Sequence, residues 1–210
     1  MTDGIIIVGG GGHAKVVAEA LRAAGERVLG FTDPRADAPN LLPGVANPPR
    51  RLGDDAFLAA QNTASTRLAL GIGSVRPGAA RADLFARLKD MGFRFATVVH
   101  PSAVVAADAI LGEGCQIMAG AVIQPGCRIG DGAIVNTRAS VDHDGTVGRF
   151  VHVAPGATLS GGVTLGDGCH VGTGAVVVQN VAIGANAFVT AGAVVTADVA
   201  ADAKTGRDGR

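Results

Sequence analysis

The segment IGDGAIVNTRASVDHDGTVGRFVHVAPGATLSGGVTL, residues 129–165, places an aliphatic residue at every sixth position. A small or apolar residue mostly stands two positions before each aliphatic residue, and Gly recurs three positions after many of them. Residues two apart on a strand face the same side, and Gly permits tight bends between short strands. The repeat continues in both directions through fourteen positions: Ile117, Ile123, Ile129, Val135, Val141, Val147, Val153, Leu159, Leu165, Val171, Val177, Ile183, Val189 and Val195.

A six-residue period is typical of a parallel β-helix, in which three strand-and-corner units close one triangular coil. An α-helix is excluded because six does not match its turn of about 3.6 residues and because Gly is too frequent. The same period runs through Val98, Val104 and Ile110, and one inserted residue separates this run from the later one. We therefore predict a β-helix over residues 96–200 and a C-terminal tail over 201–210.

The composition fits a narrow core built from thin layers. Apolar residues make up 48% of the chain, aromatic residues only 3%, and Gly accounts for 32 of 210 residues. Lys plus Arg equals Asp plus Glu, at 18 each, which argues against nucleic acid or an anionic membrane as a partner. No apolar run is long enough for a transmembrane helix, and no basic segment typical of a signal peptide precedes the first strand. The expected location is the cytoplasm.

Residues 1–95 lack the six-residue period and instead alternate strand-like and helix-like segments. This alternation predicts a small parallel α/β domain of Rossmann type, with its boundary near residues 95–99. The expected elements are strands over 5–8, 28–32 and 67–72, a helix that ends at Gly25, a loop over 37–50 and a helix over 77–91.

A glycine-rich turn, Gly9 to Ala14, joins the first strand to the first helix. Backbone N–H groups at a helix N-terminus bind phosphate, and Asp33 follows about 20 residues later, where such folds bind a ribose or base. The turn therefore favours phosphate or nucleotide binding over a tight packing turn. Nicotinamide binding is less favoured, because residues 1–95 hold only half of a full dinucleotide domain.

His143 stands between Asp142 and Asp144, two positions beyond the inward-facing Val141. It is either a solvated corner residue or an oriented base. Three units make about 18 residues per coil, so Gly161 is expected beside His143 on the next coil. A base next to bare backbone N–H donors is the minimum set for acyl transfer.

His152 and His170 are also one coil apart, so their rings are expected side by side, as a metal site or a ligand groove. No convincing third ligand accompanies them, and we predict no metal. His100 is expected to be structural. Cys115, Cys127 and Cys169 occupy the small inward position and are interpreted as core residues without a disulfide.

Five motifs occur in order along the chain: IIIVGGGGHAK, LGFTDP, LGIGS, VVHPSA and NTRASVDHDGTVGRFVHVAPGATLSGGV. Together they resemble the sugar O-acyltransferase family, whose members include sialic-acid O-acetyltransferases and hexapeptide-repeat nucleotide-sugar N-acetyltransferases. The resemblance implies a left-handed β-helix, a homotrimer with active sites between β-helices, and acetyl-CoA as co-substrate. It implies acetylation of the 4-amino group of a nucleotide-linked amino sugar, with O-acetylation of a sugar such as sialic acid as the alternative.

The resemblance also implies roles for individual residues in acetyl transfer. His143 resembles the catalytic base and Asp144 the acid that orients it. His152 matches a His that contacts acetyl-CoA, Gly161 a Gly whose N–H faces the thioester carbonyl, and Thr173 is assigned to the same co-substrate site.

The remaining assignments concern the sugar substrate. Asn136 matches an active-site Asn near the sugar. Gly12, His13 and Gly73 are assigned to the nucleotide-sugar site, with Asp33 near the base. The N-terminal domain, residues 1–95, is thereby expected to bind the nucleotide-sugar.

Two features depart from the family. Asp144 stands where Glu is usual after the catalytic His. The common ending Gly-x-Pro-Ala-Lys/Arg, which often borders the CoA adenine, is replaced by the residues from Thr205 to Arg210.

Two functions of other classes compete with this interpretation. A β-helix carbonic anhydrase is disfavoured by the His spacing and by the additional α/β domain. A non-catalytic nucleotide-binding protein would not need His143, Asp144 and Asn136 together.

Overall fold

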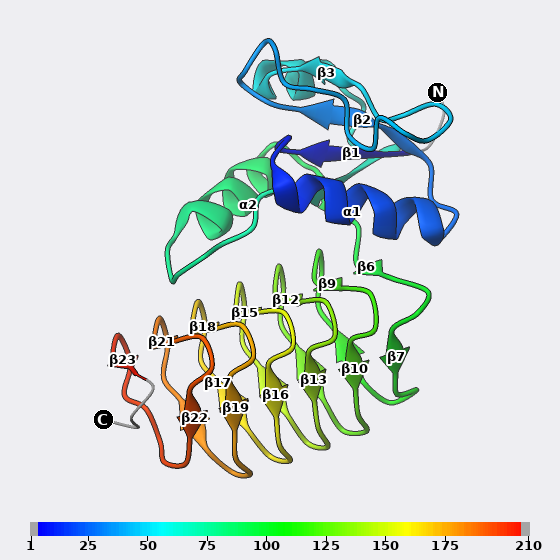
Figure 1. Ribbon diagram of the computed structural model, residues 1–210. Helices are drawn as coiled ribbons and strands as arrows, with labels where there is room; N and C mark the ends of the chain where they lie inside the picture. Colours follow the sequence, from blue (N-terminus) through cyan, green and yellow to red (C-terminus); the bar gives the residue numbers. More distant parts are fainter. Residues whose placement is uncertain (1–3, 207–210) are drawn as a thin grey trace.

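The computed structural model describes residues 4–206 and contains an α/β unit followed by a triangular solenoid (Figure 1). The strands of the α/β unit form one parallel sheet in the order β3-β2-β1-β4-β5. The predicted fold class is confirmed. The elements are β1 (Gly4–Val8), α1 (Gly12–Ala23), β2 (Val28–Thr32), β3 (Arg51–Gly53), the 3₁₀ helix η1 (Asp55–Ala60), β4 (Thr66–Leu70), α2 (Ala80–Asp90) and β5 (Arg94–Phe95).

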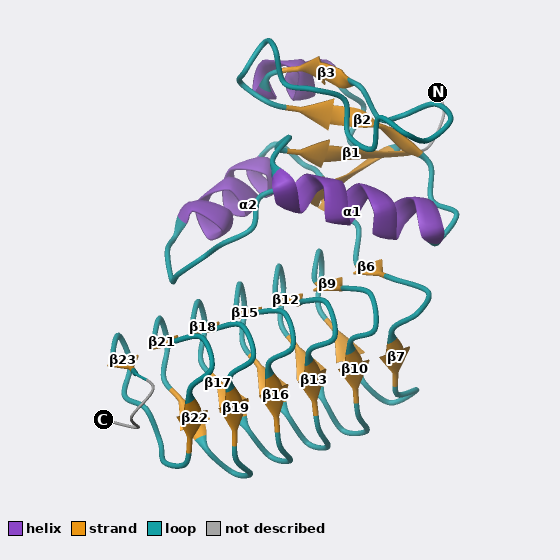
Figure 2. Ribbon diagram, viewed as in Figure 1, coloured by secondary structure: helices purple, strands orange, loops and turns teal. Residues whose placement is uncertain are grey.

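The sheet is covered on both faces. Ile5 packs with residues of α1, whereas Ile6 packs with Phe85 of α2, which explains the unbroken apolar run of this central strand. Gly25 takes a φ of 74° directly after α1, a conformation that favours glycine. Figure 2 shows both helices close to the solenoid, and Val98 of the solenoid joins the core beneath α1.

The solenoid is a left-handed β-helix with three parallel sheets of six, five and seven strands. Inward residues pair with the residue 18 positions later, as Val135 does with Val153, so each coil has three sides. The last coil is shorter, because Val189 pairs with Thr205, 16 positions later. Its strands are β6 (Val98–Val99), β7 (Val104–Val105), β8 (Ile110–Leu111), β9 (Gln116–Ile117), β10 (Val122–Ile123), β11 (Arg128–Ile129), β12 (Ile134–Val135), β13 (Ser140–Val141), β14 (Thr146–Val147), β15 (His152–Val153), β16 (Thr158–Leu159), β17 (Thr164–Leu165), β18 (His170–Val171), β19 (Val176–Val177), β20 (Ala182–Ile183), β21 (Phe188–Val189), β22 (Val194–Val195) and β23 (Lys204–Thr205).

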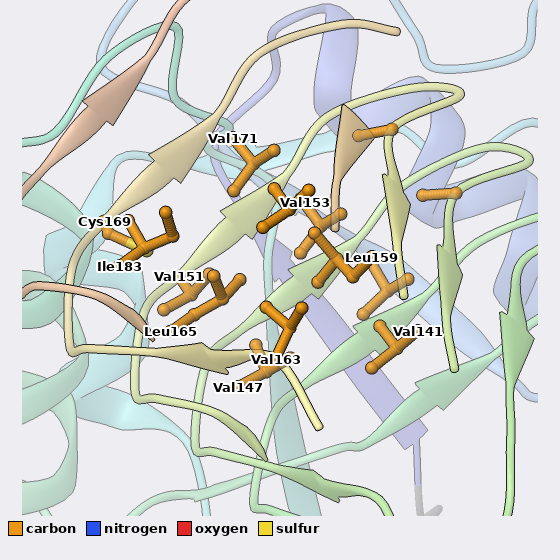
Figure 3. Packing of buried hydrophobic residues seen from close by; sticks show 14 of the residues in the cluster. Val141, Val147, Val151, Val153, Leu159, Val163, Leu165, Cys169, Val171 and Ile183 are labelled. Atoms are coloured by element: carbon orange, nitrogen blue, oxygen red, sulfur yellow. The ribbon is translucent and has the colours of Figure 1, made fainter. Parts of the chain in front are cut away.

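The repeated aliphatic residues fill the interior of the coils. Figure 3 shows Val141, Val153, Leu159 and Val171 packed together, and each has at most 1% of its surface exposed. Cys115, Cys127 and Cys169 are free and buried in the same core, and burial raises the pKa of Cys169 to about 12. These thiols therefore stay protonated and act as small apolar residues.

The inward-facing residues predicted for the first three strands of the β-helix, Val98, Val104 and Ile110, were wrong. Val104 and Ile110 are 62% and 52% exposed, and the inward residues are Val99, Val105 and Leu111. The period is thus unbroken, with no inserted residue. Both residues of each of these strands are aliphatic, so residue type does not separate them, whereas the period extended back from Ile117 gives Leu111, Val105 and Val99.

The β-helix also continues beyond the predicted limit, because β23 pairs with β21 inside the range assigned to the tail. Residues 207–210 of that tail lie outside the described part of the chain. We propose the domain boundary between β5 and β6, which belong to different sheets.

Buried polar contacts fix the two units against each other. The Gln116 Nε2 donates a hydrogen bond of 2.8 Å to the Leu70 carbonyl, and its Oε1 lies 2.7 Å from His13 Nε2. The Arg81 guanidinium donates to the carbonyl oxygens of Ile72 and of Gly132, the latter at 2.8 Å. Within residues 4–206, neither helix has the length and apolar character needed to cross a membrane.

Candidate active site

His143 and Asp144 form an exposed pair at the corner between β13 and β14. The His143 Nδ1 lies 2.9 Å from the Asp144 carboxylate, and the two side chains are 65% and 75% exposed. The hydrogen bond to Asp144 raises the pKa of His143 above its usual value, and the charge of Asp142 adds to the effect. With Nδ1–H donating to Asp144, Nε2 carries the free lone pair that a general base requires.

Gly161 lies directly against the His143 ring on the next coil, as the 18-residue spacing predicts. A Cβ at position 161 would lie 2.5 Å from His143 Cε1, so a side chain there would displace the imidazole. The Gly162 N–H donates to the His143 carbonyl at 2.8 Å. In the described chain, the Gly161 N–H has no hydrogen-bond partner. An oriented base and an unused backbone donor therefore lie side by side.

A second group forms around His152 at a different corner. Its Nδ1 lies 2.9 Å from the Ser74 carbonyl oxygen, and its Nε2 lies 3.0 Å from Asn136 Nδ2. Burial lowers the pKa of His152 to about 3, and the neighbouring His170 contributes. The ring is therefore neutral at physiological pH, with Nδ1–H donating to Ser74 and Nε2 accepting from Asn136.

Three of the residues predicted for the nucleotide-sugar meet at one cavity. Gly12, His13 and Gly73 line a space of about 580 Å³ that His152 also borders. Burial lowers the pKa of His13 to about 4, so this ring is neutral too. The backbone at Gly73 passes so close to His13 that a Cβ there would lie 3.2 Å from the His13 Cβ.

Asp33 lies behind the glycine-rich turn and is not among the residues lining this cavity. One carboxylate oxygen accepts from the Gly10 N–H at 2.8 Å, and both oxygens accept from the Arg35 guanidinium. Mainly because of the Arg35 hydrogen bonds, the pKa of Asp33 falls to about 2. Asp33 therefore holds the turn in place, and a direct contact with a nucleotide base would require Arg35 to move.

A second cavity of about 320 Å³ continues from His152 along the β-helix. Thr173, predicted to contact acetyl-CoA, lines it together with His170 and Phe188. The rings of His152 and His170 have centroids 4.8 Å apart, as their 18-residue spacing predicts. Among the residues that the structure describes, no three His, Cys, Asp or Glu side chains are placed to hold a metal ion.

The structure thus divides the predicted residues between two corners. His143 and Asp144 lie at the corner after β13, and Gly161 lies at the same corner one coil later, after β16. Asn136 follows β12, His152 is on β15 and Thr173 follows β18, so these three lie on or beside another sheet. Sequence reasoning missed Ser74, Gln116 and Arg81, which connect the α/β unit to the β-helix. Only the motif LGIGS, which contains Ser74, carried a signal for one of them.

The six-residue β-helix is the architecture of hexapeptide-repeat proteins. Within residues 4–206 it presents an oriented His beside an unpaired backbone N–H, an arrangement suited to acyl transfer. Two family models match the chain. The PglD N-terminal domain matches residues 4–85, and the bacterial transferase hexapeptide (six repeats) matches residues 108–143.

Solved structures resemble the whole chain. The acetyltransferase domain of PglB from Neisseria gonorrhoeae FA1090, in complex with acetyl coenzyme A, is 34% identical, with a TM-score of 0.86 over 95% of this chain and 94% of that one. PerB from Caulobacter crescentus, in complex with CoA and GDP-perosamine, is 42% identical, with a TM-score of 0.84 over 96% and 92%. A mutant of GDP-perosamine N-acetyl transferase from the same organism, with one His replaced by Ala, is 40% identical, with a TM-score of 0.88 over 97% and 93%.

The chain belongs to the hexapeptide-repeat family of nucleotide-sugar N-acetyltransferases. This confirms the family predicted from the sequence and the prediction that the protein is an acetyltransferase.

Proposed function

We propose that this protein transfers the acetyl group of acetyl-CoA to the 4-amino group of a nucleotide-linked amino sugar. The observation that carries the proposal is the contact of the His143 imidazole with Gly161, whose N–H has no partner among residues 4–206. The solved relatives support it, because their complexes hold acetyl coenzyme A or CoA, and two of them also hold GDP-perosamine. Release of the CoA thiol from acetyl-CoA, followed with 4-amino and 4-hydroxy nucleotide-sugars, tests it directly.

In the proposed reaction the sugar amine attacks the thioester carbonyl. The C–N bond forms as Nε2 of His143 takes a proton from the amine, and the Gly161 N–H stabilises the negative oxygen of the tetrahedral intermediate. The C–S bond then breaks, and the proton held by His143 passes to the departing thiolate. Asp144 fixes the ring so that Nε2 stays the accepting nitrogen.

The remaining predicted residues supply the substrate sites in this proposal. Gly12, His13 and Gly73 hold the nucleotide-sugar at the larger cavity, whose lining includes Arg76 and Arg81 and no acidic residue. This lining suits the phosphates of a nucleotide. Asp33 supports the turn through Gly10, and Asn136 and His152 border the sugar and the acyl donor.

We propose a homotrimer in which each active site combines two copies of the chain. His143 and Asn136 stand at successive corners of one coil, with β13 between them, so one copy does not bring them together. The strong exposure of His143 and Asp144 is also unsuited to a reaction that must exclude water, and a second copy would cover them.

Complementation between inactive variants tests this assembly. His143→Ala and Asn136→Ala each remove one half of the proposed shared site, so each variant alone is expected to be weakly active. Coexpressed in equal amounts, they should form mixed trimers with about a quarter of the sites intact. Light scattering should give the mass of three chains. Mixed assemblies no more active than the separate variants would contradict a shared site.

The pH dependence of catalysis tests the His143–Asp144 pair. Because Asp144 raises the pKa of His143, the wild-type acid limb of kcat/KM should lie above the value of about 6.5 for free imidazole. His143 must be neutral to act as a base, so activity is lost as pH falls through this pKa. Asp144→Asn removes the main cause, and the limb should move to lower pH while the plateau rate falls. Asp142→Asn should move it less, and an unchanged limb in Asp144→Asn would contradict the pairing.

A further inference from the structure

His170 is a buried histidine to which the proposed reaction gives no role. It stands next to the inward-facing Val171 on β18, so its side chain points outward from the β-helix and lines the smaller cavity with Ser74. The ring packs edge-on between His152, at a centroid distance of 4.8 Å, and Phe188, at 5.4 Å. Only 5% of the residue is exposed.

The two nitrogens of His170 differ in their surroundings. Nδ1 is buried without a hydrogen-bond partner, whereas Nε2, which also lacks a protein partner within the described chain, retains accessible surface at the cavity. Burial lowers the pKa of His170, so the ring is neutral and carries one proton. A buried unpaired N–H is rarer in proteins than a buried unpaired acceptor. The proton therefore belongs on Nε2, and His170 offers an N–H donor to the cavity.

The smaller cavity has the chemistry of a site for a thin, uncharged chain. Among the described residues 4–206, none that lines it is charged, in contrast to the larger cavity with Arg76 and Arg81. Phosphate groups need cationic or multiple N–H donors, whereas the pantetheine arm of CoA is neutral and carries amide oxygens. The small lining residues follow the β-helix axis at the coil spacing: Ala154 and Gly172, and Pro155, Thr173 and Ala191.

We propose that His170 is a binding residue for the acyl donor, and that its Nε2–H donates a hydrogen bond to a pantetheine amide oxygen in this cavity. The inference rests on the proposed use of acetyl-CoA. It adds a donor one coil beyond His152, separate from the Gly161 N–H that meets the thioester.

Replacement of His170 tests the proposal in the full-length protein. His170→Phe removes the donor while keeping an aromatic ring, and His170→Gln keeps a side-chain N–H. The Phe variant should raise the Kd for CoA, measured by calorimetry, about 2- to 10-fold. The Gln variant should stay within about 2-fold of wild type. The KM for the nucleotide-sugar should not change. The Tm of His170→Phe should not fall, because the Phe ring leaves no unpaired nitrogen.

His100→Phe is the matched control, because His100 follows β6 in the same sheet but does not line the cavity. The control should bind CoA as the wild type does. If the His170→Phe variant does not fold, His170→Leu, which also lacks a donor, takes its place in the same measurement. Wild-type CoA affinity in His170→Phe, or equal losses in the Phe and Gln variants, would overturn the proposal. A wild-type protein that binds CoA but transfers no acetyl group would instead refute the proposed function.

Discussion

Replacing His143 with Ala is expected to lower kcat by about 10²- to 10⁴-fold, the usual loss when a general base is removed. The loss should appear in kcat rather than in binding, because His143 is assigned the proton transfer and lies outside both cavities proposed for the substrates. Steady-state rates of thiol release and calorimetric Kd values for CoA separate the two effects. His100→Ala is the control for removing an imidazole elsewhere in the β-helix.

A near-wild-type kcat in His143→Ala between about pH 6 and 8 would contradict this role. In that case the amine would react already deprotonated from solution, and the arrangement of His143 with Asp144 and Gly161 would be structural. A loss confined to KM would likewise remove His143 from the chemical step.

Gly161→Ala keeps the backbone N–H but is expected to have the second-largest effect, with a fall in kcat of about 10²-fold, as when a catalytic group is displaced by about 1 Å. The added Cβ would lie 2.5 Å from His143 Cε1, so the imidazole must move away from the reacting atoms. The backbone itself is not strained by the change, because Gly161 has no positive φ. The expected loss is therefore catalytic, and thermal unfolding should show a stable protein.

Gly44→Ala is the matched control, since a Cβ at position 44 meets no atom within 4 Å. It should leave kcat unchanged. The double variant His143→Ala/Gly161→Ala adds a sharper test. If Gly161 acts through the position of His143, its substitution should cost far less in the absence of the imidazole. Fully multiplicative losses would mean that the two residues act independently.

The β-helix could be predicted because its signal repeats many times. A single interior position such as Val141 is uninformative, but the same residue type every six positions leaves one arrangement of strands and corners. The same regularity predicts that Gly161 lies against His143 and His170 against His152, because each pair is 18 residues apart, and both contacts are confirmed. The inward-facing residue was predicted wrongly only in strands with two aliphatic residues, as at Val104 and Val105.

Contacts between the two units could not be predicted in the same way. Gln116 looks like an ordinary strand residue in sequence, yet its amide links His13 to the Leu70 carbonyl. Ser74 meets His152 only because a loop of the α/β unit reaches the β-helix. Such contacts join residues far apart in the chain and follow no period, so local patterns carry no trace of them.

The chemical structure of the product decides whether the protein acetylates the amine of a nucleotide-linked sugar. Purified protein, acetyl-CoA and a panel of UDP- and GDP-linked 4-amino sugars, with their 4-hydroxy counterparts, would be incubated and the products examined by NMR. We expect an acetyl group on the C4 nitrogen of a 4-amino sugar, as an amide, and no change in the 4-hydroxy counterparts. Acetylation of a hydroxyl oxygen, or no transfer to any amino sugar of the panel, would contradict the proposed function.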